Sequence, residues 1–211
     1  MTQFSGTELI CYRGGRTVFR GLKFTVAPGA ALVLVGPNGS GKSSLLRLMA
    51  GLLQPTSGTI AWGGEPISEE PELHNQRIQY VGHQTCIKPV LTVSENLGFW
   101  SGIHGGGTDL ILEALEMFDI GHLIDVPGQF LSAGQKQRVN LARILASPTK
   151  LWLLDEPTTA LDVSAISKLE QAIEQHRQNG NMVVLSTHSG LNLSNTITLN
   201  LGQYAVGWEE L

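Results

Sequence analysis

At 211 residues the chain is long enough for one well-buried core, and its composition argues against several classes of protein. The apolar fraction of 42% is typical of a globular protein rather than a disordered one, and the net charge of −4 argues against a dedicated nucleic-acid binder. The two cysteines, Cys11 and Cys86, do not form a CxxC pair, and the six histidines show no HExxH spacing. We therefore expect neither a disulfide framework nor a zinc site.

No segment of the sequence is expected to enter a membrane. The longest apolar runs, such as residues 30–35, are far shorter than the ~20 residues needed to span a bilayer. The first six residues have neither the basic region nor the apolar region of a secretory signal. A function at a membrane would therefore require a partner that holds the chain there.

The first sixty residues are predicted to contain short strands and one helix. A continuous apolar run at 31–35 indicates a strand that is covered on both faces. A glycine-rich turn at 36–41 separates this strand from a helix expected over 43–51, with Gly51 near its C-terminal end. The other extended segments are predicted at 8–12, 17–19, 24–26 and 58–62.

The remainder of the chain combines a helical middle with a return to buried strands. Strands are predicted at 151–154 and 182–185, and helices at 94–100, 109–118, 133–146 and 163–177. Strands that alternate with helices predict a mostly parallel α/β core. We expect one domain, 1–211, in which 1–84 and 150–211 form the core with an N-terminal antiparallel β part, and 85–149 is a helical insertion.

A phosphate-binding loop of the form G-x4-G-K-[ST] lies between the strand at 31–35 and the helix after it. Glycines let successive backbone N–H groups point at phosphate oxygens, and the helix N-terminus adds favourable partial charge. Lys42 is expected to reach the β- and γ-phosphates, and Ser43 to bind Mg²⁺. The alternative, a glycine turn that only begins a helix, fits the strand–loop–helix context less well. The predicted nucleotide-binding residues are Gly36, Pro37, Asn38, Gly39, Ser40, Gly41, Lys42, Ser43 and Ser44.

The loop alone leaves GTPases, kinases and helicases open, and two carboxylates narrow the choice. Asp155 and Glu156 end the apolar strand at 151–154, and they should face different ways because side chains alternate along a strand. Asp155 is suited to the Mg²⁺ shell, and Glu156 to orienting or deprotonating the attacking water. The DxxG match at 125–128 is interpreted as a turn, since no guanine-reading Asn-Lys-x-Asp motif follows it.

A second helix N-terminus provides a second candidate anion site. Ser132 is placed to cap the helix predicted over 133–146, and small residues approach its exposed N–H groups. The segment consists of Leu131, Ser132, Ala133, Gly134 and Gln135. By itself it is also compatible with a plain N-capped amphipathic helix.

Together these motifs resemble those of the ABC ATPase family over nearly the whole chain. The ordered set also includes Gln84 as the Q-loop glutamine, Asp162 in the D-loop and His188 as the switch histidine, with Ala133 where glycine is commoner in the signature. The resemblance implies that Gln84 contacts Mg²⁺ or the water, and that His188 holds the γ-phosphate and the water. It also implies a homodimer on ATP binding, in which the signature of one protomer closes on the ATP held by the other. Whether Tyr12 stacks on adenine is left open, because it lies about one residue from the commonest position of the family aromatic.

The text around Gln84 is similar to one branch of that family. The string G-H-Q-x-x-I-K-x-x-L-T-x-x-E-N-L at 82–97 resembles the ATPase subunits of cytochrome c maturation (haem exporter) systems, although Thr158 and Thr159 depart from that pattern. The resemblance implies an ATP- and Mg²⁺-dependent subunit docked to an integral-membrane permease at the cytoplasmic face of the bacterial inner membrane, with other maturation proteins as partners. No CxxCH motif is present, so we expect no direct haem binding, and no nucleic acid is expected as a partner. The rival interpretations are another small ABC exporter, a soluble non-transport ABC ATPase, and a nucleotide-binding regulator without turnover.

Overall fold

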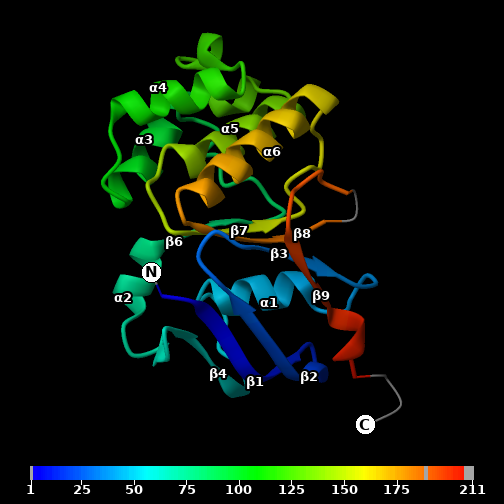
Figure 1. Cartoon of the computed structure of the whole chain (residues 1–211). Helices are drawn as coiled ribbons and strands as arrows, with labels where there is room; N and C mark the ends of the chain where they lie inside the picture. Colours follow the sequence, from blue (N-terminus) through cyan, green and yellow to red (C-terminus); the bar gives the residue numbers. More distant parts are fainter. Residues whose placement is uncertain (1, 188–189, 207–211) are drawn as a thin grey trace.

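Two β-sheets of opposite character form the framework of the protein. The computed structural model describes residues 2–187 and 190–206, and Figure 1 shows the two sheets with one helix between them. All strand pairs of the first sheet are parallel, in the order β6-β7-β8-β3-β9, which confirms the predicted parallel core. Its strands are β3 (Ala31–Val35), β6 (Ile78–Val81), β7 (Leu151–Asp155), β8 (Met182–Ser186) and β9 (Thr196–Asn200).

The second sheet is antiparallel, with the strand order β2-β1-β4-β5. Its long hairpin closes at Gly14-Gly15, whose φ angles of 61° and 80° give the mirror-image turn that suits the twist of paired strands. As a result Arg13 and Arg16, which flank the turn, lie opposite each other. The strands are β1 (Phe4–Arg13), β2 (Arg16–Val26), β4 (Ser57–Trp62) and β5 (Glu65–Pro66).

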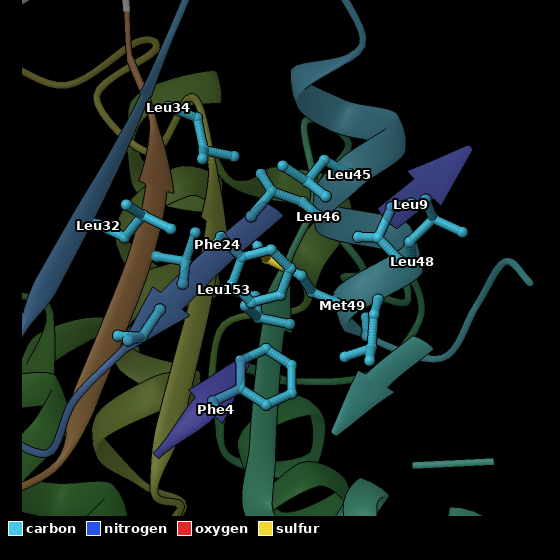
Figure 2. Close-up of a cluster of buried hydrophobic side chains, with 14 of the residues drawn as sticks. Phe4, Leu9, Phe24, Leu32, Leu34, Leu45, Leu46, Leu48, Met49 and Leu153 are labelled. Carbon is cyan, nitrogen blue, oxygen red and sulfur yellow. The ribbon is translucent and has the colours of Figure 1, made fainter. Parts of the chain in front are cut away.

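Helix α1 (Lys42–Met49) is packed between the two sheets, and its position fixes that of the loop before it. The helix ends at Met49 with Ala50 as its C-cap, and Gly51 follows with a φ of 70°, as expected for a glycine after a helix C-terminus. Figure 2 shows its apolar side chains surrounded by residues of both sheets. The labelled residues of this cluster are Phe4, Leu9, Phe24, Leu32, Leu34, Leu45, Leu46, Leu48, Met49 and Leu153.

Strand β7 is buried on both faces because helices cover the sheet on both sides. Leu151 and Leu153 belong to the cluster around α1, whereas Trp152 and Leu154 belong to a second cluster with α5 (Ala133–Leu145) and α6 (Val163–Gln178). The alternation follows from the two-residue repeat of a strand. A continuous apolar sequence is therefore what this position requires.

The remaining helices lie mostly at the end of the molecule farthest from the antiparallel sheet (Figure 1). Among them α3 (Val93–Ile103) and α4 (Thr108–Met117) pack with α5, whereas α2 (Pro71–Arg77) lies before β6. Three short 3₁₀ helices also occur among the described residues: η1 (Gly121–Leu123), η2 (Gly128–Phe130) and η3 (Leu201–Gln203). Within the residues that the structure describes, no helix is both long and apolar enough to cross a membrane.

Each strand and helix predicted from the sequence is present, with small shifts at the ends; the two extended segments at 17–19 and 24–26 are parts of the single strand β2. Helix α2 and strands β5, β6 and β9 were not predicted. Helices α3, α4 and α5 all lie within 85–149, the segment expected to be a helical insertion.

Candidate functional site

The phosphate loop connects β3 to α1 in a conformation that depends on glycine. Gly36, Gly39 and Gly41 have φ angles of 142°, 80° and 102°, values that residues with a side chain rarely adopt. At Gly41 a Cβ atom would also lie 2.7 Å from a side-chain carbon of Val18. Helix α1 has no side-chain cap and no acidic residue in its first turn, so its N-terminus is suited to a bound anion.

Lys42 folds back over this loop rather than extending into solvent. Its Nζ donates hydrogen bonds to the carbonyl oxygens of Gly36, at 2.8 Å, and Pro37, at 3.4 Å. The side chain is buried, which leaves its charge close to the backbone of the loop. The ammonium group is therefore held where it can bind a phosphate oxygen.

Two serines hold the carboxylate at the end of β7. Ser43 Oγ donates to Asp155 Oδ1 at 3.0 Å, and Ser186 Oγ, at the end of the neighbouring strand β8, donates to the same oxygen at 2.8 Å. Ser43 and Asp155 thus place two oxygen ligands side by side, a donor set that fits Mg²⁺. Among the described residues no three His, Cys, Asp or Glu side chains gather as a metal site, so phosphate oxygens and water would have to complete the shell.

The backbone turns sharply at Glu156, directly after the end of β7. Its φ of 51° lies in the left-handed region, and its N–H donates to Oγ of Ser186 at 3.1 Å. Ser186 therefore holds the carboxylate of Asp155 and the backbone of Glu156, a role that sequence reasoning missed. The signal was its place at the end of an apolar strand parallel to β7, where Asp155 and Ser186 are register partners.

The loop and Glu156 enclose a hollow of about 440 Å³. Seven of its lining residues were predicted from the sequence: Asn38, Gly39, Gly41, Lys42, Ser43, Ser44 and Glu156. Three were not: Arg13, Arg16 and Val18, all from the β1–β2 hairpin. The loop residue Ser40 is buried beneath the surface, and its hydroxyl contacts no described hydrogen-bond partner.

Two other single residues predicted for the site, Tyr12 and Gln84, are not among the described residues that line this hollow. Tyr12 is 56% exposed, and its backbone N–H donates to Thr56 Oγ1. Gln84 is exposed in the loop that follows β6, the strand next to β7. His188 lies outside the described residues.

The predicted signature occupies the N-terminus of α5. Ser132 and Gln135 form a reciprocal capping box, in which the N–H of Gln135 donates to Ser132 Oγ at 3.2 Å and the N–H of Ser132 to Gln135 Oε1 at 2.9 Å. Leu131 is buried, Ser132 and Ala133 are exposed, and Gly134 lies between these extremes. The five signature residues are absent from the described lining of the hollow.

The predicted D-loop aspartate is tied to the signature helix. Asp162 caps α6 by accepting the N–H of Ala165 at 2.9 Å, and it forms an ion pair with Arg138 of α5 at 2.5 Å. The backbone hydrogen bond from Ala165 lowers the pKa of Asp162, and Arg138 adds to the effect. The carboxylate is therefore ionised while it caps the helix.

Comparison with known proteins agrees with this arrangement. The family described as "ABC transporter" matches residues 19–159. The chain is 53% identical over 210 residues to the cytochrome c biogenesis ATP-binding export protein CcmA of Paramagnetospirillum magneticum, covering 98% of this chain and 97% of the relative. It is 41% identical over 194 residues to the protein of the same name from Escherichia coli K12, covering 92% and 93%.

Solved structures support the fold. A putative ABC transporter ATP-binding protein from Pyrococcus furiosus superposes with a TM-score of 0.83 at 24% identity, covering 97% of this chain and 100% of that chain. A structure described as the ATP-binding subunit of an ABC transporter gives a TM-score of 0.84 at the same identity, covering 95% and 87%. With its phosphate loop, paired carboxylates and near full-length relatives, the chain belongs to the ABC transporter family.

Proposed function

We propose that this chain is the ATP-hydrolysing subunit of an ABC transporter complex that serves cytochrome c biogenesis, either in haem delivery or export or in release of the haem carrier. The assignment to cytochrome c biogenesis rests on the 53% identity, over 98% of the chain, to a relative that is named for that process. The fold neighbours, at 24% identity, support only the ABC architecture. Another small ABC exporter is the second candidate.

The hydrolytic role rests on the groups that converge on the hollow. We assign Lys42 and the N–H groups at the start of α1 to the phosphates of ATP, together with the rest of the loop 36–44. Glu156 accepts a proton from the water whose oxygen attacks the γ-phosphorus, and the bond from that phosphorus to the oxygen shared with the β-phosphate breaks. Glu156 then gives the proton to the products, and ADP and inorganic phosphate leave. Ser43, Asp155 and Gln84 would hold Mg²⁺, which would neutralise charge on the β- and γ-phosphates.

A second protomer would complete the site. The signature 131–135 is absent from the described lining of its own chain's hollow, and its capped helix N-terminus offers N–H donors to an anion supplied from elsewhere. We assign these donors to the γ-phosphate of ATP held by the partner in a homodimer, with Asp162 in the D-loop between the sites. His188 is assigned to the γ-phosphate and the water.

The helical segment is the proposed link to the membrane. We divide the chain into a core, 1–84 and 150–211, and a helical subdomain, 85–149, and we place the contact with an integral-membrane permease on the latter. The chain would then be peripheral at the cytoplasmic face of the bacterial inner membrane, together with other cytochrome c maturation proteins. We assign neither haem nor nucleic acid as a direct ligand.

Deletion of the gene, followed by complementation, tests the pathway. Wild-type protein should restore covalently haem-bound c-type cytochromes, whereas Lys42→Ala should not, and b-type haem proteins should be spared throughout. Normal c-type cytochromes in the deletion strain would refute the assignment and favour another exporter.

Size-exclusion chromatography of Glu156→Gln with ATP tests the dimer. Hydrolysis should stop while ATP still binds, so the dimer should accumulate. A protein that binds ATP but remains a monomer would contradict the shared site.

A further inference from the structure

The β1–β2 hairpin brings two guanidinium groups to the nucleotide hollow. Arg13 and Arg16 are register partners on either side of the glycine turn, and both line the hollow. Arg13 Nη1 lies 3.5 Å from Ser44 Oγ, and Arg16 Nη2 lies 3.5 Å from the carbonyl oxygen of Gly39. Each arginine therefore reaches across from the antiparallel sheet to the phosphate loop or to the helix that follows it.

The charge around this hollow is strongly one-sided. Three of its described lining residues, Arg13, Arg16 and Lys42, are cationic, whereas Glu156 is the one carboxylate among them. They surround the N-terminus of α1, which has no acidic residue in its first turn and is itself the positive end of a helix dipole. The three cationic side chains repel one another and are repelled by the positive end of the α1 dipole. A polyanion bound among them relieves this repulsion.

The position of Ser44 indicates which phosphate Arg13 would meet. Ser43 donates a hydrogen bond to Asp155, and Glu156 lines the hollow together with Ser43. The reacting γ-phosphate therefore belongs at the end of the hollow where Ser43 and Glu156 lie. Ser44 follows Ser43 in α1. Successive backbone N–H groups at the start of this helix lie along the triphosphate in the direction from the γ-phosphate to the α-phosphate. Arg13, which contacts Ser44, is thus near the α-phosphate end of the triphosphate.

This placement separates Arg13 from its neighbour Tyr12. The lining of the hollow includes Arg13 but not Tyr12, which is 56% exposed. Adjacent side chains on a strand point to opposite faces, so of these two residues only Arg13 faces the hollow at the phosphate loop. The predicted role of Tyr12 concerns the adenine base, whereas that of Arg13 concerns the phosphates.

We propose that Arg13 is a nucleotide-positioning residue that binds the α-phosphate of ATP, with Arg16 adding positive charge at the same turn. The inference rests on the proposed ATPase function and adds a contact from the antiparallel sheet. Because the α-phosphate does not react, Arg13 should contribute equally to binding in the ground state and in the transition state.

Binding titrations with Arg13→Ala, Arg13→Lys and the control Arg20→Ala test the proposal. Arg20 is exposed on the same hairpin and does not line the described hollow, so its loss makes the same change in net charge. With Arg13→Ala, the Kd for ATP, ADP and inorganic tripolyphosphate should rise by a similar factor, roughly tenfold, as expected for a lost charge-assisted hydrogen bond. KM for ATP should rise with little change in kcat, Arg13→Lys should be affected less, and Arg20→Ala should match wild type.

Three results would overturn the proposal. If Arg13→Ala binds ATP as tightly as the wild type, the proposed contact between Arg13 and the α-phosphate is refuted. If it binds ATP more weakly but tripolyphosphate equally well, Arg13 contacts the base or the ribose instead. Failure of the wild-type protein to bind ATP would overturn the proposed function as well, whereas equal affinities of wild type and Arg13→Ala would overturn this inference alone.

Discussion

Replacement of Ser186 by alanine should weaken both the fold and catalysis. The side chain is fully buried, its Oγ donates to Asp155 Oδ1 at 2.8 Å, and it accepts the N–H of Glu156 at 3.1 Å. In Ser186→Ala the buried carboxylate keeps only the bond from Ser43 among those described, and one N–H loses its side-chain acceptor.

The magnitude follows from the hydrogen bond to the charged group. A buried bond of this kind contributes about 2 kcal/mol to the free energy of unfolding. For a domain of this size that corresponds to a Tm lower by about 4–8 °C. The Asp155 carboxylate and the backbone of Glu156 also lose a positioning contact, and a loss of about 1.4 kcal/mol in transition-state stabilisation would lower kcat roughly tenfold.

Thermal unfolding without nucleotide and phosphate-release kinetics would measure the two effects. Ser147→Ala is the matched control, because Ser147 is equally buried but its hydroxyl has no hydrogen-bond partner among the described residues. This variant should be neutral or slightly stabilising. If Ser186→Ala melts and turns over like Ser147→Ala, the reasoning about Asp155 and Glu156 is wrong.

Three further predictions address the loop, the buried histidine and a helix cap. Gly41→Ala should weaken ATP binding at least roughly tenfold in titrations, since its φ of 102° and the 2.7 Å contact with Val18 both resist a Cβ; Gly98→Ala, in open space on α3, should bind normally, and equal affinities would contradict the strain argument. Burial lowers the pKa of His74 from 6.5 to about 4, so the unfolded chain takes up a proton first as pH falls, and stability should fall by about 3 kcal/mol between those values. Denaturant titrations should show a shallower pH dependence for His74→Gln, and an unchanged slope would refute this. Thr92→Ala removes the cap of α3 and should lower Tm by about 2–4 °C, whereas Thr92→Ser should not; equal melting of the two would count against the cap.

The sequence was sufficient for the loop and the carboxylates because their chemistry is local. The segment 36–43 is recognisable from the spacing of its glycines, lysine and serine. Asp155 ends an apolar strand, and it is expected near this loop because the strands of a parallel sheet end at the same edge. Ser186 required more, namely the register that sets it opposite Asp155. Arg13 and Arg16 required knowledge of how the antiparallel sheet folds over α1, a contact between distant parts of the chain.

The elements that were not predicted are those whose burial depends on partners. Strand β6 includes Gln79, which is 3% exposed because it lies in the sheet and its Nε2 donates to the carbonyl oxygen of Arg143 at 3.5 Å. A polar residue in a four-residue strand weakens the apolar pattern on which such a prediction depends. Strand β9 is largely exposed at the other edge of the sheet. Edge strands carry the weakest pattern, and these two were missed for that reason.

The burial of β7 on both faces also determines how the enzyme should fail when heated. Its odd-numbered apolar residues pack into one hydrophobic cluster and its even-numbered ones into the other, and the strand ends at Asp155. Melting of either cluster therefore frees the strand that carries the carboxylate. A folded but inactive form should not accumulate on heating, and loss of activity should coincide with loss of structure.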